Sequence, residues 1–168
     1  RVFLPGDTLW LALLTLAALA LRLWGTGSRA LLPDEGSSLY YAQLPLATLL
    51  WSLCDPHPPG YYLLLRSVAA LGQGEAWLRL PSALAGTLAV PLTWAVARAA
   101  IGPTAQPHRR WPDQAAMLAA ALVAAAPLAV WYSQEARAYA LLSLLSLAMT
   151  WAGLRWRLRP TTWTATAF

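Results

Sequence analysis

Long apolar runs separated by short polar segments organise this chain. The first run, from Thr8 to Trp24, is rich in Leu and Ala and is roughly 17 residues long, the lower limit for crossing a hydrocarbon core of about 30 Å. Three further apolar runs cover about residues 76–97, 114–132 and 138–154. The pattern predicts an all-α polytopic membrane protein with about four transmembrane helices, at 8–24, 76–97, 114–132 and 138–154.

Between the first two runs, residues 25–75 contain shorter elements and turns. Pro33 followed by two acids suits a helix N-terminus, and Glu35 to Leu50 is predicted to be a short amphipathic helix. The proline-rich stretch from Cys54 to Gly60 predicts a rigid turn. Tyr61 to Leu71 is apolar but roughly 12 residues long, too short for a span, so we expect an interfacial or re-entrant helix there.

Small residues and one proline add detail to the predicted spans. Ser82 and Gly86 are four residues apart, a spacing that lets two membrane helices approach closely. Ser143, Ser146 and Thr150 share one helical face, which we interpret as an inter-helix seam. Pro127 is expected to kink the third span.

Arginine positions predict the orientation of the spans. If the arginines at the far ends of the second and fourth spans are cytoplasmic, the positive-inside rule places residues 25–75 and 133–137 outside the cytoplasm. This topology brings most of the acids and several basic residues to one membrane face, namely Asp34, Glu35, Asp55, His57, Glu75, Arg79, Glu135 and Arg137.

Composition supports a membrane location and excludes other classes. Hydrophobic residues make up 58% of the chain and the mean hydropathy is +0.48, which excludes an ordinary soluble domain and a disordered chain. The net charge of +5 comes from arginine alone, because the chain has no lysine. These arginines lie singly or in pairs at the ends of apolar runs, so we interpret them as topology signals and expect no nucleic-acid partner.

The single cysteine, Cys54, excludes an intrachain disulfide. Cys54, Asp55 and His57 together suggest a metal site, but their spacing matches no established ligand pattern, and a turn is the simpler explanation. A divalent metal is therefore possible, although the sequence indicates none. The chain begins at Arg1 and ends in an apolar approach to another helix, so we expect the N-terminal part of a longer protein.

Two adjacent acids, Asp34 and Glu35, are the first candidates for chemistry. In a chain with 11% charged residues, carboxylates beside an apolar segment belong in a wet site at the bilayer surface. Neighbouring helical residues point about 100° apart, so one acid is expected to act as a base and the other to orient. A positioned base is worth roughly 10² to 10⁴ in rate. The alternative is that both acids only stabilise the helix dipole.

Arg79 and Arg137 lie at the predicted outer ends of the second and fourth spans. A guanidinium suits a lipid phosphate, because its fork donates two hydrogen bonds and stays charged. Each arginine has a simpler explanation: it snorkels, or Arg137 forms a local ion pair with Glu135. The aromatic residues of this face predict either an interfacial belt or stacking on sugar, and include Tyr40, Tyr41, Trp51, Tyr61, Tyr62 and Trp77.

The order of four motifs resembles a known family. Pro33-Asp34-Glu35, His57-Pro58-Pro59-Gly60-Tyr61-Tyr62, Leu78-Arg79-Leu80-Pro81-Ser82 and Gln134-Glu135-Ala136-Arg137 follow one another on the same predicted face. In this order they resemble the N-terminal part of GT-C type glycosyltransferases that use polyprenyl-phosphate sugars, the group of protein O-mannosyltransferases and bacterial aminoarabinose transferases. The resemblance covers nearly the whole chain from Leu9 to Arg157.

The resemblance implies a fold, a reaction and roles for particular residues. The reaction would be an inverting hexosyl or pentosyl transfer from a polyprenyl phosphate to an extracytoplasmic lipid, glycan or protein, in the bacterial plasma membrane as part of cell-envelope chemistry. Asp34 would be the catalytic base and Glu35 its neighbour in the site. Arg79 and Arg137 would bind the lipid phosphate, while His57, Glu135 and Tyr61 would shape the substrate pocket. The family's enzymes are longer than this chain, so we expect the chain alone to be inactive.

Two other functions fit the same pattern. A non-catalytic membrane scaffold or lipid-handling subunit would keep the architecture, and it predicts that Asp34→Asn has no effect. A transporter would line its pathway with charges near the middle of its helices, whereas the charges here gather at helix ends.

Overall fold

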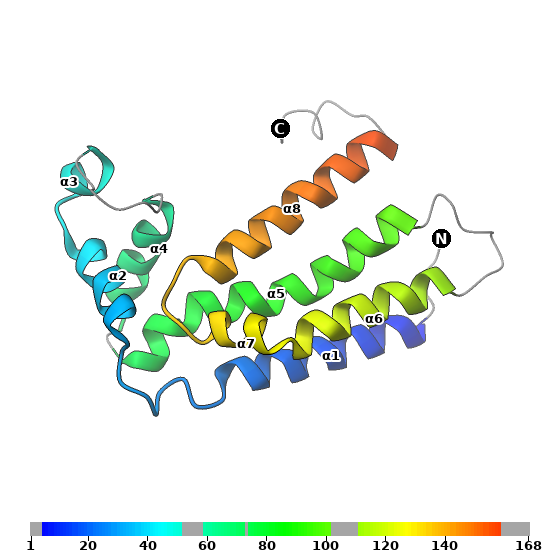
Figure 1. The fold of residues 1–168 in the computed structure, drawn as a ribbon, viewed down its shortest axis with the longest axis horizontal. Coiled ribbons are helices and arrows are strands. Elements are labelled where there is room, and N and C mark those ends of the chain that lie inside the picture. The colour runs from blue at the N-terminus through cyan, green and yellow to red at the C-terminus, as the bar shows by residue number, and fades with distance from the viewer. Residues whose placement is uncertain (1–4, 52–58, 73, 102–110, 159–168) are drawn as a thin grey trace.

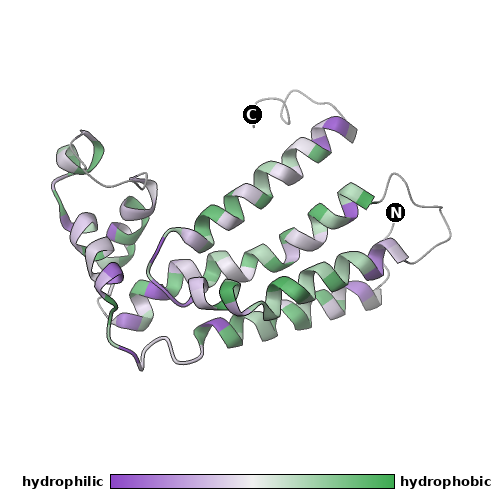
Figure 2. Ribbon diagram, in the orientation of Figure 1, coloured by the Kyte–Doolittle hydropathy of each residue, from purple (hydrophilic) through white to green (hydrophobic). Residues whose placement is uncertain are grey.

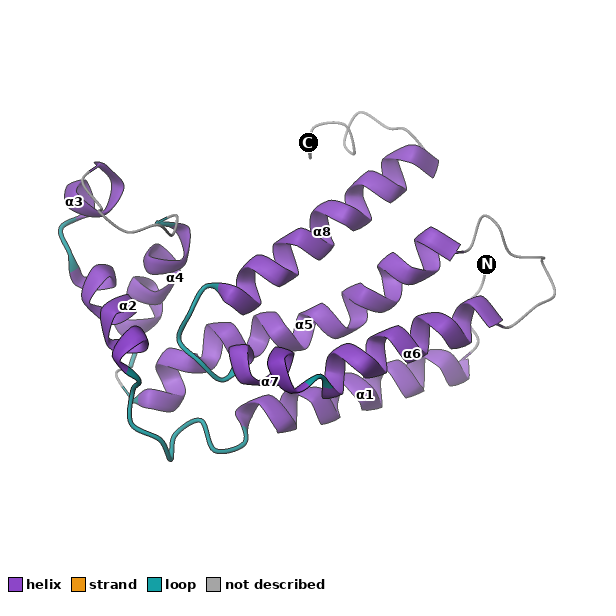
Figure 3. Cartoon of the chain, viewed as in Figure 1, coloured by secondary structure: helices purple, strands orange, loops and turns teal. Residues whose placement is uncertain are grey.

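The computed structural model describes residues 5–51, 59–72, 74–101 and 111–158, and within these ranges the chain is all helical, with no strand (Figure 3). The predicted all-α class is therefore confirmed. The helices are α1 (Pro5–Leu23), α2 (Pro33–Gln43), α3 (Leu46–Trp51), α4 (Gly60–Ala69), α5 (Glu75–Ile101), α6 (Trp111–Ala125), α7 (Pro127–Ser133) and α8 (Tyr139–Leu158).

The four long helices alternate in direction and form a bundle with α5 at its centre (Figure 1). The 27-residue α5 packs against α1, α6 and α8, while α2, α3 and α4 gather at the end where α5 begins. A single helix occupies three of the four ranges expected to cross a membrane, and α6 and α7 divide the fourth, 114–132. The crossing itself stays a prediction.

Two apolar clusters hold the bundle together. At one end, the aromatic rings of Tyr61 and Tyr62 are buried with Leu65 and Leu78 where α4 meets α5. The other cluster is built largely from alanine. On α6, buried alanines four residues apart lie against α1 and α5, and their small side chains let the helices approach closely. The buried members of this second cluster are Ala18, Val90, Trp94, Ala116, Ala120 and Ala124.

Glycine and proline set the ends of several helices. Helix α1 ends just before Gly25, whose φ of 71° is the left-handed conformation favoured after a helix C-terminus. Pro127 separates α6 from α7, and the two are bent by 56°. The predicted kink is confirmed, because proline offers no N–H to continue the helix.

The predicted helix from Glu35 to Leu50 is wrong as a single element. The structure divides it into α2 and α3, because Leu44 adopts an extended conformation with ψ of 152° before Pro45. The ring of a proline disfavours helical geometry in the preceding residue. The break ends α2 at Gln43 and turns the chain toward α3.

Apolar residues run along all the long helices of the bundle (Figure 2), and many of the large ones are exposed. Large hydrophobic side chains face outward along α1, α6 and α8, and they include Leu13, Leu16, Leu118, Leu122, Leu145 and Met149. Among the described residues, α5 is long and apolar enough to cross a membrane, and the bent pair of α6 and α7 also qualifies if it forms one span. The face of α8 that carries Ser143, Ser146 and Thr150 is exposed, so the predicted inter-helix seam does not form among the described residues.

Candidate functional site at one end of the bundle

Six of the seven predicted site residues gather where α2, the start of α4, the first turns of α5 and the turn between α7 and α8 meet, as their elements show in Figure 1. The seventh, His57, lies outside the described residues. The six are Asp34, Glu35, Tyr61, Arg79, Glu135 and Arg137. Sequence segments about 100 residues apart therefore converge on one end of the bundle.

Glu35 is completely buried, and both of its carboxylate oxygens are occupied. It stands in the first turn of α2 and accepts a hydrogen bond of 2.8 Å from the amide of Leu32, which half-completes a capping box. Its other oxygen accepts from the amide of Ala136 at 2.8 Å. Glu35 thus ties the start of α2 to the turn before α8.

Arg79 completes this buried arrangement from α5. Its Nη2 lies 2.6 Å from Oε2 of Glu35, and its Nε donates to Oε1 at 2.8 Å, so the pair is bidentate. Three backbone carbonyls of the loop after α1 take its remaining donors, and all five N–H groups of the guanidinium are satisfied. These carbonyls belong to Thr26, Arg29 and Ala30.

The hydrogen bonds around Glu35 determine its charge. Burial alone would raise the pKa of this carboxyl, but the hydrogen bonds from Arg79 and from the amides of Leu32 and Ala136 outweigh burial, and the pKa is lowered. Glu35 is therefore ionised and fixed. The geometry suits a role in positioning the surrounding segments, because no lone pair is left free to take a proton from a substrate.

Asp34 differs from its neighbour in almost every respect. Its side chain is 78% exposed, in the same first turn of α2 that buries Glu35. One oxygen lies 4.0 Å from Nη2 of Arg137. An exposed carboxylate beside a single cation is free to approach a substrate hydroxyl.

Arg137 lies in the turn between α7 and α8 and is only partly buried. Nη1 donates to the backbone oxygen of Asp34 at 3.1 Å, and Nη2 donates to the hydroxyl of Tyr139 at 3.2 Å, with the guanidinium 5.5 Å from the centre of that ring. Burial acts to lower the pKa of Arg137, but the hydrogen bond to Tyr139 and the nearby acids raise it. Unlike Arg79, Arg137 has hydrogen bonds to described residues from only two of its five N–H groups, although its side chain is just 14% exposed.

Tyr61 and Glu135 flank these residues. The Tyr61 hydroxyl is buried and lies 3.0 Å from Oγ of Ser82, which itself donates to the backbone oxygen of Arg137. Burial raises the pKa of the Tyr61 hydroxyl, so this group stays neutral. Glu135 is half-buried; burial, together with the charge of Glu35, raises the pKa of its carboxyl.

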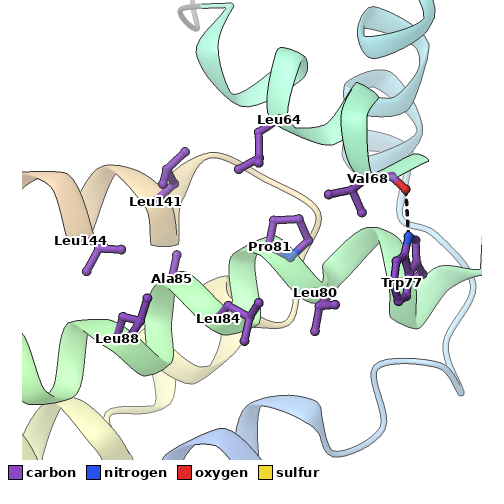
Figure 4. A pocket seen from close by; sticks show the side chains of 10 residues that line it. All are labelled: Leu64, Val68, Trp77, Leu80, Pro81, Leu84, Ala85, Leu88, Leu141 and Leu144. Atoms are coloured by element: carbon purple, nitrogen blue, oxygen red, sulfur yellow. Dashed lines mark hydrogen bonds between the residues drawn. The ribbon is translucent and has the colours of Figure 1, made fainter. Parts of the chain in front are cut away.

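An apolar cavity of about 290 Å³ lies between α4, α5 and α8 (Figure 4). None of the six described site residues lines it, although Pro81, which precedes Ser82, and Leu141, two residues beyond Tyr139, point into it. Apart from the indole of Trp77, whose N–H donates to the backbone of Val68, its lining side chains are entirely aliphatic.

No three metal-ligating side chains come together within the part of the chain that the structure describes. The candidate cluster of Cys54, Asp55 and His57 lies outside that part. The described site residues comprise three carboxylates, two guanidiniums and one phenol, a set suited to proton transfer and anion binding.

Sequence reasoning missed several residues that hold the site. Ser82 was noted only for its small size, yet it links Tyr61 to the Arg137 backbone. Gln134 donates to the carbonyls of Leu21 and Trp24 at the end of α1. The sequence shows Gln134 directly before Glu135 and Arg137, but it does not indicate that the partners of Gln134 lie more than 100 residues away.

Comparison with known families bears on this arrangement. The model of the family described as the protein O-mannosyl-transferase TMEM260 N-terminal domain matches residues 46–168. The chain belongs to this family. The matched region includes Arg79, Glu135 and Arg137, whereas Asp34 and Glu35 precede it. No curated protein and no solved structure gave a match.

Proposed function

We propose that this chain is the N-terminal part of a membrane glycosyltransferase that transfers a sugar, with inversion, from a polyprenyl phosphate to an extracytoplasmic acceptor. Membership of the TMEM260 N-terminal-domain family supports mannose as the sugar and a protein hydroxyl as the acceptor, because the family is described as a protein O-mannosyl-transferase. The observation that carries the proposal is the exposed Asp34 carboxylate beside Arg137, held in place by the buried pair of Glu35 and Arg79.

The reaction needs a base on the acceptor and positive charge at the leaving group. Asp34 takes the proton of the acceptor hydroxyl while the hydroxyl oxygen attacks the anomeric carbon of the sugar. The bond between that carbon and the phosphate oxygen breaks, and the polyprenyl phosphate leaves with the electron pair. Attack from the face opposite the phosphate inverts the configuration.

Arg137 is the residue assigned to the departing phosphate. It lies 4.0 Å from the proposed base, and its two hydrogen bonds to described residues leave further N–H groups for a phosphate. Arg79 is reassigned from phosphate binding to positioning, since its five N–H groups are already used within the protein. Glu35 has the same positioning role, and Tyr61, Glu135 and His57 remain proposed pocket residues.

The membrane arrangement rests on the distribution of charge in the bundle. The candidate site lies at the end where α5 begins, while Arg98, Arg155 and Arg157 lie at the ends of α5 and α8 that point the other way (Figure 1). With these arginines in the cytoplasm, α1, α5, α6 with α7, and α8 form four spans of a plasma-membrane protein, and the site faces outward. The apolar cavity between α4, α5 and α8 would then accommodate an apolar chain attached to the phosphate.

A donor comparison tests this proposal in the full-length protein reconstituted in liposomes. Labelled polyprenyl-phosphate mannose and a nucleotide-linked mannose are each offered with a peptide that carries serine and threonine. We expect transfer from the lipid donor alone, lost in Asp34→Asn and retained in the matched variant Asp113→Asn at the other end of the bundle. Transfer from the nucleotide donor, or from neither donor, would refute the proposed reaction.

A further inference from the structure

Arg22 is a buried cation that lies outside the candidate site. It stands in the last turn of α1, within a predicted span, and has no exposed surface. Its Nη1 donates to the carbonyl of Ala124 at 3.1 Å and to that of Ala18 at 3.2 Å, while Nη2 donates to the carbonyl of Val123 at 3.1 Å. No carboxylate pairs with it among the described residues. A buried charge held by carbonyls alone is costly to maintain.

The carbonyls that Arg22 binds lie where Pro127 interrupts the helix. In a continuous α-helix, the carbonyl of Val123 would accept the N–H of residue 127, and proline has none. Because α6 ends at Ala125, the Ala124 carbonyl also belongs to its unpaired last turn. A guanidinium supplies two donors to these groups and places positive charge at the negative end of the α6 dipole.

The same guanidinium and the end of α7 both lie against Gly86 of α5. A Cβ added to Gly86 would lie 3.0 Å from Nε of Arg22 and 2.8 Å from Cβ of Ser133. Arg22, Gly86 and Ser133 therefore share one tightly packed layer, in which residue 86 has room for hydrogen only. Ser133 is the last residue of α7, and the turn that carries Arg137 begins at the next position.

We infer that Arg22 is a positioning residue: it holds the break between α6 and α7 and, through α7, fixes the turn from Gln134 to Arg137. The structural half of this inference stands alone, and its consequence for sugar transfer rests on the function proposed above. In this arrangement the Pro127 break directs α7 toward the site, and Arg22 makes that break stable inside an apolar bundle.

Amide hydrogen exchange of the full-length protein in nanodiscs tests the inference without an activity assay. The reporter is the Ala136 amide, which is protected by Glu35. In Arg22→Met we expect its exchange to become about tenfold faster, with a smaller change in Arg22→Lys, which keeps the charge but not the forked geometry. Amides in the middle of α5 should keep their wild-type rates, and the control Arg98→Met should leave Ala136 unchanged.

A second substitution tests the link to proline. Pro127→Ala restores an N–H to the Val123 carbonyl, so in that background Arg22→Met should change the Ala136 exchange by less than about twofold. The inference would be overturned if Arg22→Met left the Ala136 exchange rate unchanged, or accelerated exchange equally throughout α5 and α8. It would also be overturned if Arg22→Met changed the Ala136 exchange rate by the same factor with and without Pro127→Ala. If the turn loosens but transfer continues at the wild-type rate, Arg22 keeps its assigned role and the function proposed for Arg137 fails instead.

Discussion

Two acid–arginine pairs lie next to each other at the same end of this bundle and are built for opposite purposes. Glu35 and Arg79 are joined by two short hydrogen bonds, are buried, and have every polar atom satisfied by protein groups. Asp34 and Arg137 are 4.0 Å apart, and the acid is mostly exposed. The saturated pair, Glu35 with Arg79, can hold segments together but has no free donor or acceptor for a substrate. The open pair, Asp34 with Arg137, can contact a substrate but stabilises the fold little. One position in the sequence separates the two kinds of acid.

The comparison predicts the largest loss of stability when the buried pair is broken. Glu35→Gln or Arg79→Lys should lower the free energy of unfolding by about 3–5 kcal/mol, since each leaves a buried charge or donor set without its partner. Unfolding in detergent micelles, followed by circular dichroism, measures the change. Glu75→Gln and Arg66→Lys are matched controls at exposed positions. A loss below about 1 kcal/mol would show that the pair does not hold the segments.

The packed layer at Gly86 provides a second test of how rigidly the Arg137 turn is held. Gly86→Ala should cost about 1–3 kcal/mol, because the added methyl group overlaps Ser133. Gly36→Ala in α2 is the matched control: its Cβ meets nothing within 4 Å, and the protein should gain up to about 1 kcal/mol from helix propensity. Equal effects of the two substitutions on thermal unfolding would contradict the packing described at Gly86.

Breaking the open pair should have little effect on folding. Arg137→Gln is expected to change the free energy of unfolding by no more than about 1 kcal/mol, because the ion pair is long, at 4.0 Å, and its acid is exposed. The same variant should raise the KM for a polyprenyl-phosphate donor, because Arg137 is assigned to the phosphate. A stability loss as large as that of Arg79→Lys would remove the distinction between the two pairs.

The smallest predicted effect concerns the pH dependence of stability. The lowered pKa of Glu35 means that its contribution is fully present above its unfolded pKa, near 4.5, and is lost as pH falls through the folded value. Glu135 affects the pH dependence of stability with the opposite sign, because its raised pKa makes the ionised form unfavourable in the folded state. Glu135→Gln should therefore raise the melting temperature slightly at pH 7 and lose this advantage as pH falls. An advantage that grows toward acidic pH would contradict the sign.

The sequence predicted the helices better than it predicted the roles of the charged residues. Apolar blocks and Pro127 located the long helices and the kink, because burial and proline geometry are local properties of the chain. Pro45 is an equally local signal, from which the break between α2 and α3 could have been predicted. Which acid is buried depends on partners from distant segments: Glu35 receives a hydrogen bond from Ala136, and Arg79 binds carbonyls near residue 29.

Arg22 illustrates the same limit. In the sequence it is an arginine at the end of an apolar run, for which snorkelling is the ordinary explanation. Its carbonyl partners on α6 are more than 100 residues away, so only the packed structure shows that it is buried. His57 and the rest of residues 52–58 lie outside the described residues, so their roles stay predictions.

The most direct test measures sugar transfer and unfolding free energy together for Asp34→Asn and Glu35→Gln in the full-length protein. Asp34→Asn should lower transfer by roughly 10² to 10⁴ while changing stability by less than about 0.5 kcal/mol. Glu35→Gln should instead lose about 3–5 kcal/mol of stability, and the transfer it loses should follow the loss of folded protein. Wild-type transfer by a folded Asp34→Asn protein would contradict the account.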